Sequence, residues 1–379
     1  MSDSVYITGM NVITPISDSL DVFWENIISP PQEGLEKQVI DIDGKAKPLK
    51  ITRRMNRISK GAFLSTMGAF EDRELTENHY DPFDVGCIVS ATMPSLDSLM
   101  DFLSSLYDHG ANFTSPVAFS NTVANSCVAN LAIKYKLKGP SNVFVSSTGL
   151  QNACLMLQHK RAAAFLVGGY EDFTDEILRG YNELPYTHKE QDGKVSLYSP
   201  DSDGMYVKER MVSFILEREG SPYLTDKSKI YCSIEGTSTV RKEIGNTEYT
   251  LESFVPSDFE RSMKLLLEKN NIKPSQITAV VGAASGFSIL DQAELTAIKN
   301  VFGDKINILS VKDIYGDCQG TNIFLNVATG AMILKNSVMS YCFTPENMEK
   351  SNKPFEGEYI IANGYCAYGN VMSILLKKY

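Results

Sequence analysis

The chain has 379 residues, of which 43% are hydrophobic and 22% are charged, and its formal net charge is −10. This composition is ordinary for a globular protein, and the length suits two domains or one large duplicated one. No run rich in lysine and arginine stands out, so partnership with nucleic acid or an anionic membrane has little electrostatic support.

The first part of the chain alternates short β-branched runs with longer helical patterns. Strands are predicted at Val5–Thr8, Val85–Ser90, Asn142–Ser146, Ala163–Val167 and Val212–Glu217. Helices are predicted at Leu20–Ile28, Met55–Phe70, Leu96–Tyr107, Val117–Tyr135 and Leu150–His159. Alternation of this kind is typical of a layered α/β fold with mainly parallel sheets.

A second series of the same kind follows. Its strands are predicted at Ile230–Glu235, Ile277–Val281, Ile306–Val311, Val338–Phe343, Tyr359–Ala362 and Met372–Leu376, and its helices at Phe259–Lys269, Gln292–Val301 and Phe324–Leu334. The polar stretch 218–228 contains Gly and Pro and falls between the two series. We therefore predict two similar halves, residues 1–217 and 229–379, with residues 218–228 as the joint.

Cysteine usage and hydropathy indicate the cellular compartment of the protein. The seven cysteines lack CxxC or metal-type spacing and their number is odd, which predicts free thiols in a reducing compartment and no metal site. Nothing approaches 18 uninterrupted apolar residues, and the N-terminus lacks a signal-peptide pattern. We expect a cytoplasmic protein without a transmembrane helix.

Seven segments, in order, resemble β-ketoacyl synthases. They include VYITGMNVITPISDSLDVFWENI at the start, RRMNRISKGAFLSTMGAFED, the GPSNVFVSST turn and strand, LVGGYEDF, GAASGFSILDQAELTAIKNVFG, SVKDIYGDCQG and YIIANGYCAYGNVMSILLKK. The resemblance spans nearly the whole chain. It implies the α/β thiolase-like fold, with two related halves in a five-layered α/β/α/β/α arrangement and mixed, mainly parallel sheets.

The family's nucleophilic cysteine is absent from the position that the resemblance assigns to it. That cysteine stands eight residues after the proline of the Gly-Pro turn, where a helix N-terminus lowers the pKa of its thiol. Counting from Pro140 reaches Thr148, with Gly149 beside it, and neither residue restores a thiol. Cys154 lies further along the same helix in an apolar run, where we expect a small buried hydrophobic residue.

Both catalytic histidines of the family are also replaced. In the A-H-G-T-x-T-x-x-G-D-x-x-E pattern, Asp291 and Glu294 keep the register, and the histidine position is Ala283. In the K-S-x-x-G-H-x-x-G-A pattern, Lys312 keeps the register, and the histidine position is Asp317. The four histidines present match neither position. The family's condensation chemistry needs those imidazoles to stabilise an enolate oxygen and assist decarboxylation.

Two glycine-rich turns of the family are rebuilt as well. The F-G-F-G-G turn, which helps form the oxyanion hole and gates the acyl pocket, has become residues 365–369, with Ala367 at the gate followed by Tyr368 and Gly369. The G-x-G-A-G loop has become residues 208–212, KERMV. A loop that closely approaches another backbone uses glycine, so its replacement indicates altered packing there.

These losses predict a chain-length-factor-like subunit, not catalytic alone, of the kind found in polyketide, aryl polyene or fatty-acid-like biosynthesis. It would form a heterodimer with an active β-ketoacyl synthase, meet acyl carrier protein through that partner and need no cofactor. The resemblance places the interface at the 121–127 helix and the strand at 142–146. The alternatives are an enzyme of this fold with altered chemistry (a malonyl-carrier decarboxylase or acyltransferase) and a homodimeric acyl-binding protein.

Overall fold

Twelve strands of the described chain form one mixed sheet, in the order β10-β9-β8-β7-β11-β12-β6-β1-β5-β4-β2-β3. The computed structural model describes residues 4–76, 79–93, 95–190, 192–241, 251–366 and 368–379. The strands are β1 (Val5–Ile13), β2 (Val85–Ser90), β3 (Ser141–Phe144), β4 (Ala164–Glu171), β5 (Arg210–Arg218), β6 (Cys232–Arg241), β7 (Ile277–Val281), β8 (Asn307–Leu309), β9 (Val338–Thr344), β10 (Asn347–Pro354), β11 (Tyr359–Cys366) and β12 (Asn370–Lys377). β1 and β6 join the two halves of this sheet over only three residue pairs.

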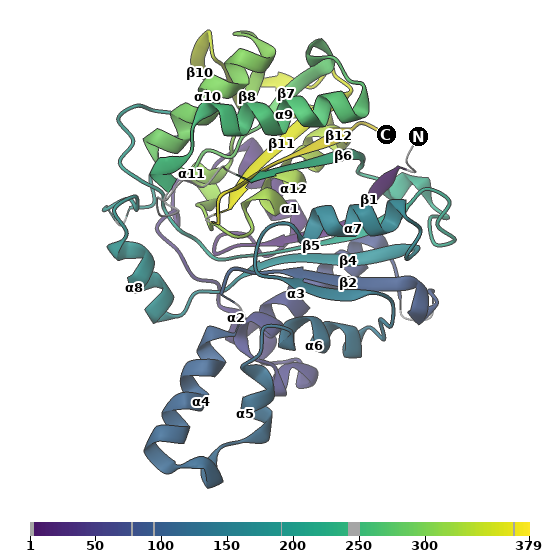
Figure 1. Cartoon of the computed structure of the whole chain (residues 1–379), viewed down its shortest axis with the longest axis vertical. Helices are drawn as coiled ribbons and strands as arrows, with labels where there is room; N and C mark the ends of the chain where they lie inside the picture. The colour runs from purple at the N-terminus through teal and green to yellow at the C-terminus, as the bar shows by residue number, and fades with distance from the viewer. Residues whose placement is uncertain (1–3, 77–78, 94, 191, 242–250, 367) are drawn as a thin grey trace.

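Helices cover and separate the two halves of the sheet (Figure 1). The principal helices are α1 (Leu20–Ile28), α2 (Ile42–Ala46), α3 (Arg57–Arg73), α4 (Leu96–His109), α5 (Pro116–Asn121), α6 (Ser126–Lys134), α7 (Gly149–Gln158), α8 (Asp175–Glu183), α9 (Pro256–Asn270), α10 (Ser288–Phe302), α11 (Lys312–Tyr315) and α12 (Asn322–Asn336). α3 and α6 lie outside one half, α9 and α10 outside the other, and α1, α7 and α12 lie between them. The predicted five-layer arrangement of the thiolase-like fold is confirmed.

The hydrophobic core divides in the same way as the layers. The central cluster contains Phe23 of α1, Leu150 of α7 and Phe324 of α12, all fully buried between the two halves of the sheet. A second cluster lies under α9 and α10, and a third under α3 and α6. α12 is buried along nearly its whole length, as expected for a helix packed between two sheets.

Two expectations about the elements were wrong. Four strand pairs are parallel (β2–β3, β2–β4, β7–β8 and β7–β11) while seven are antiparallel, so the sheet is mixed but not mainly parallel. The segment predicted as one helix, residues 117–135, divides into α5 and α6. The side chain of Asn56 binds the carbonyl oxygen of Asn121, at the end of α5, and this contact holds the break in place.

Among the described residues, no helix is long and apolar enough to cross a membrane. The proposed joint, residues 218–228, lies between β5 and β6. The division of the chain into halves on either side of that joint stays a prediction.

Candidate functional site

The predicted nucleophile positions lie where the segment after β3 enters α7. Thr148 is the residue before the first turn of α7, and its hydroxyl lies 2.8 Å from that of Ser146. The amide of Gly149 donates to Ser90 Oγ at 3.2 Å, and a Cβ at Gly149 would collide with that same oxygen. Position 149 therefore has no room for a side chain, while Thr148 is half-buried and offers only a hydroxyl.

The loop after α11 closes over this helix start. Ser147 donates its hydroxyl hydrogen bond to the carbonyl oxygen of Gly320 at 2.5 Å. A side chain at Gly320 would collide with Thr92 and with Glu171, so the glycine permits this close approach. The nucleophile position and the second histidine motif, far apart in sequence, thus meet at one place.

Asp317 lies at the centre of the candidate site, and its side chain is fully buried. Tyr365 donates its hydroxyl hydrogen bond to Asp317 Oδ2 at 2.5 Å, and Lys312 Nζ lies 3.4 Å from the same oxygen. Asp317 Oδ1 has no hydrogen-bond partner among the described residues. At the predicted second histidine position the chain therefore places a carboxylate held by a phenol and an ammonium group.

Lys312 also connects the two histidine positions. Its ammonium group donates to the carbonyl oxygen of Ala283 at 2.5 Å, and both residues are buried. Burial lowers the pKa of Lys312, and the carboxylate of Asp317 partly opposes this effect. The structure therefore brings Ala283 and Asp317 to either side of one buried lysine, with no imidazole at either position.

The carboxylates of Glu294 and Asp291 hold the segment that carries Ala283. Glu294 accepts the amide of Ala283 at 2.8 Å and the hydroxyl of Tyr198 at 2.9 Å. Asp291 accepts the amides of Ser285 and Tyr198 at 2.7 and 3.0 Å. Burial raises the pKa of both carboxyls, that of Asp291 to about 6. Each carboxyl is occupied by bonds within the protein, so both positions have a structural role.

Two long basic side chains occupy the rebuilt loop at the start of β5. Lys208 Nζ donates to the carbonyl oxygen of Ile314 at 2.8 Å, and burial lowers its pKa to about 8. Arg210 Nη2 donates to the carbonyl oxygen of Gly316 at 2.7 Å. Both side chains are 0% exposed, and Nε and Nη1 of Arg210 have no partner among the described residues. Side chains thus fill space that glycines would leave open in this loop.

The turn between β11 and β12 carries the predicted gate positions. Ala367 lies outside the described residues. Tyr368 is half-exposed, and Gly369 has φ of +82°, a conformation that favours glycine. Sequence reasoning did not single out Tyr365, which lies two residues before the gate position and reaches Asp317. The β11–β12 register, in which Tyr365 pairs with Val371, places this side chain on the buried face.

The cysteines and histidines lie away from these positions or are inert. Cys154 is buried, as expected, and burial raises the pKa of its thiol to about 12. His79, His109 and His159 are exposed. His188 is buried and lies 2.6 Å from Asp203. In the described part of the chain, one group has potential metal-ligand atoms within 4.8 Å of one another, namely His188, Glu190 and Asp192.

Comparisons with known proteins decide the family. Residues 31–220 match the model of the beta-ketoacyl synthase N-terminal domain, and residues 231–343 match that of the C-terminal domain. The chain belongs to the beta-ketoacyl synthase family. Similar curated proteins include the 3-oxoacyl-[acyl-carrier-protein] synthase 2 of Synechocystis sp., 23% identical over 99% of this chain and 98% of that protein. The corresponding protein of Coxiella burnetii is 23% identical over 91% and 89% of the two chains.

Solved structures show the same fold along the whole ketosynthase-family chain. A beta-ketoacyl synthase from Burkholderia phymatum superposes with a TM-score of 0.82 at 17% identity, covering 100% of both chains. The ishigamide ketosynthase/chain length factor superposes with a TM-score of 0.82 at 16% identity, again over 100% of both chains. These low identities establish the fold and leave the role of this member to its own residues.

Proposed function

We propose that this ketosynthase-family chain is a non-catalytic subunit that pairs with an active β-ketoacyl synthase and shapes the tunnel for the growing acyl chain. The observation that carries the proposal is the state of Asp317. At a position where the condensing enzymes of the family place a histidine, a buried carboxylate binds Tyr365 and Lys312. A carboxylate there repels the malonyl carboxylate that an imidazole would assist.

The nucleophile position supports the same proposal. A hydroxyl becomes a nucleophile when an adjacent base removes its proton. The hydroxyl of Thr148 instead lies beside that of Ser146, which is not a base at neutral pH. A decarboxylase or acyltransferase of altered chemistry would need a base or oxyanion donor here. The buried side chains of Lys312, Asp317 and Arg210 are all 0 or 1% exposed, which disfavours direct contact with a substrate.

The edge of the sheet next to this site supports pairing with a second subunit. β3 is the terminal strand of the sheet, and Ser141 and Asn142 on it are exposed. An exposed edge strand presents unpaired amide and carbonyl groups to another chain. The apolar side chains of Val123 and Val145 nearby are 44% and 47% exposed. The residues predicted as one interface helix, 121–127, span the end of α5 and the start of α6.

A projecting pair of helices adds to this surface. α4 and α5 extend away from the layered body (Figure 1), and none of the residues in either helix is buried. Their apolar side chains include Tyr107 and Phe119, and Phe113 lies in the turn between them. Apolar surface of this extent marks interaction sites in soluble proteins. Similar solved structures include a type II acyl-carrier protein in complex with its ketosynthase and the ishigamide ketosynthase/chain length factor, which supports the same class of partner.

The test is co-expression of this chain with intact Cys-His-His ketosynthases of the same organism, with an affinity tag on one subunit. We expect a one-to-one complex that elongates acyl-carrier substrates. A ketosynthase variant lacking its cysteine should abolish turnover, while Thr148→Ala in this chain should leave turnover nearly unchanged.

Two results would contradict the proposal. The first is acylation of this chain alone by acyl-carrier protein or acyl-CoA, measured by intact-protein mass spectrometry. The second is a homodimer that consumes malonyl-carrier protein without any partner, which would favour the decarboxylase alternative.

A further inference from the structure

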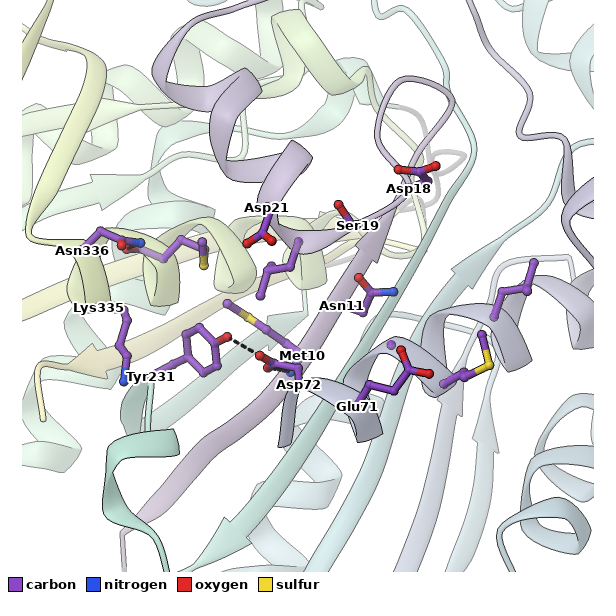
Figure 2. A pocket seen from close by; sticks show the side chains of 15 residues that line it. Met10, Asn11, Asp18, Ser19, Asp21, Glu71, Asp72, Tyr231, Lys335 and Asn336 are labelled. Carbon is purple, nitrogen blue, oxygen red and sulfur yellow. Dashed lines mark hydrogen bonds between the residues drawn. The ribbon is translucent and has the colours of Figure 1, made fainter. Parts of the chain in front are cut away.

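A cavity of about 500 Å³ lies outside the candidate site, between β1, the start of α1, the end of α3 and the end of α12 (Figure 2). None of the residues of the former catalytic positions lines it. Its lining combines carboxylates with apolar side chains. A ligand bound there would not depend on the proposed partner role.

Four carboxylates line the cavity: Asp18, Asp21, Glu71 and Asp72. Asp72 is anchored, since its oxygens accept the amide of Met10 at 2.9 Å and the hydroxyl of Tyr231 at 2.8 Å. Asp18 also pairs with Lys45 at 3.1 Å. Asp72 is thus the carboxylate that the protein holds in place, while Asp18, Asp21 and Glu71 are exposed.

The one lysine in this lining does not neutralise these charges. Lys335 Nζ donates to the carbonyl oxygens of Ser228 and Ile230 at 2.5 and 3.0 Å, and it lies 5.6 Å from the centre of the Tyr231 ring. Figure 2 shows this side chain directed away from Asp21. Asp21 and Glu71 form no ion pair within the described residues, so a bound cation would meet two carboxylates that the protein leaves unpaired.

Asn11 provides an observation independent of the charges. Its side chain lines the cavity and is only 6% exposed, and its amide forms no hydrogen bond with the described residues. A Cβ at Gly68 would collide with Asn11 Nδ2, so the glycine makes room for this amide. A polar ligand in the cavity would supply the missing bond to the amide oxygen.

The spacing of the carboxylates distinguishes between cations. A compact metal ion requires several ligand atoms close together. In the described part of the chain, none of these four carboxylates belongs to a group of three ligand residues whose atoms lie within 4.8 Å of one another. The apolar side chains of Met10, Leu20, Leu64, Met67 and Met332 line the same cavity. Carboxylates that share a cavity with apolar surface suit ammonium groups joined by methylenes. We propose that this cavity binds a small aliphatic polyamine, with Asp21, Glu71 and Asp72 pairing its ammonium groups.

The test is calorimetric titration of the full chain with spermidine at low ionic strength. We expect saturable binding of one spermidine, weakened at least tenfold by the double substitution Asp21→Asn, Glu71→Gln. Both residues are exposed, so this variant should fold. The matched control is Glu349→Gln, Glu356→Gln, which removes the same charge from an exposed region elsewhere and should bind spermidine like the unchanged chain.

A second variant tests the buried amide. Asn11→Leu should bind spermidine several-fold more weakly while its thermal midpoint in the absence of ligand does not fall, because the amide has no partner to lose. Equal weakening in both double variants would show attraction to the net charge alone and overturn the proposal. An absence of saturable spermidine binding would also overturn it. So would Mg²⁺ binding that the cavity variants abolish and that spermidine does not displace.

Discussion

Tyr365 donates its hydroxyl hydrogen bond to Asp317 in a region where neither side chain reaches solvent. Asp317 stands at the predicted histidine position and Tyr365 at the predicted first phenylalanine of the turn, so the two predicted changes would compensate each other. Lys312 contributes a longer contact to the same carboxylate. Because burial of an unpaired carboxylate is costly, these side chains form one unit.

Removing the hydroxyl of Tyr365 should lower the stability of the folded chain. Tyr365→Phe leaves Asp317 with one remaining contact, the ammonium group of Lys312 at 3.4 Å. A hydrogen bond to a buried charged group contributes on the order of 2 kcal/mol, so the free energy of unfolding should fall by about that amount. Urea denaturation measures it, and Tyr368→Phe at the half-exposed turn is the control that should change little. An unchanged free energy for Tyr365→Phe would show that Asp317 is not held in this way.

Glu171 should make stability depend on pH. Burial raises its pKa to about 7, although hydrogen bonds from Thr92 oppose the shift. Between the ordinary pKa of a glutamate and pH 7 the folded state therefore holds more protons than the unfolded state, so stability falls as pH rises through this window. Glu171→Gln keeps the acceptor for Thr92 but cannot ionise.

We expect the difference in unfolding free energy between Glu171→Gln and the unchanged chain to grow in favour of the variant from pH 5 to pH 8. Other buried carboxyls titrate in both proteins and cancel in the comparison. A difference that stays constant across this range would contradict the raised pKa.

Among the elements, the junction between α3, α5 and α6 depends on one side chain. Asn56 accepts the amide of Ser59 at the start of α3, and its Nδ2 lies within 3.1 Å of Ser95 Oγ, the Asn121 carbonyl oxygen and Ser126 Oγ. Asn56 therefore both caps α3 and forms hydrogen bonds to segments distant in sequence. This tie also explains why residues 117–135 form two helices.

Asn56→Ala should therefore cost more than the loss of an ordinary cap. We expect a fall of on the order of 2–3 kcal/mol in the free energy of unfolding, because buried hydroxyls and a carbonyl also lose a donor. Ser19→Ala, which removes the cap of α1 with no other bond, should cost about 1 kcal/mol and is the control. Equal losses in the two variants would mean that the tie to α5 and α6 contributes nothing.

At the scale of the whole molecule, substitutions at the two ends of the sheet should affect the complex with the partner differently. β3 forms one end and β10 the other. If the partner ketosynthase docks at the β3 end, the double substitution Val123→Asp, Val145→Asp should weaken the complex at least tenfold while the chain stays folded, since both side chains are exposed. Met348→Asp, at a similarly exposed apolar position on β10, should leave the complex intact. Analytical ultracentrifugation of the co-expressed pair measures both effects. A complex that the Val123→Asp, Val145→Asp substitution leaves intact would place the interface elsewhere.

The order and type of most elements followed from the sequence alone, because periodicity is a local property. Val85–Ser90 and Ile277–Val281 were predicted with their observed bounds. The exposed β10 was missed because it carries no apolar alternation, and α8 was missed because it is short and mostly polar, although Ile177 and Tyr181 have helical spacing and are buried. The seven ordered motifs were enough to identify the ketosynthase family, and counting within them located Ala283 and Asp317.

Only the tertiary structure decided what replaces the missing catalytic groups. The sequence predicted that the family's thiol and two imidazoles are absent, but not that Tyr365 reaches Asp317 or that Lys312 contacts both predicted histidine positions. Nor did it show that Arg210 donates to the carbonyl oxygen of Gly316. These contacts join residues from separate strands and loops, and their distances follow from how the layers pack, which a linear spacing does not encode.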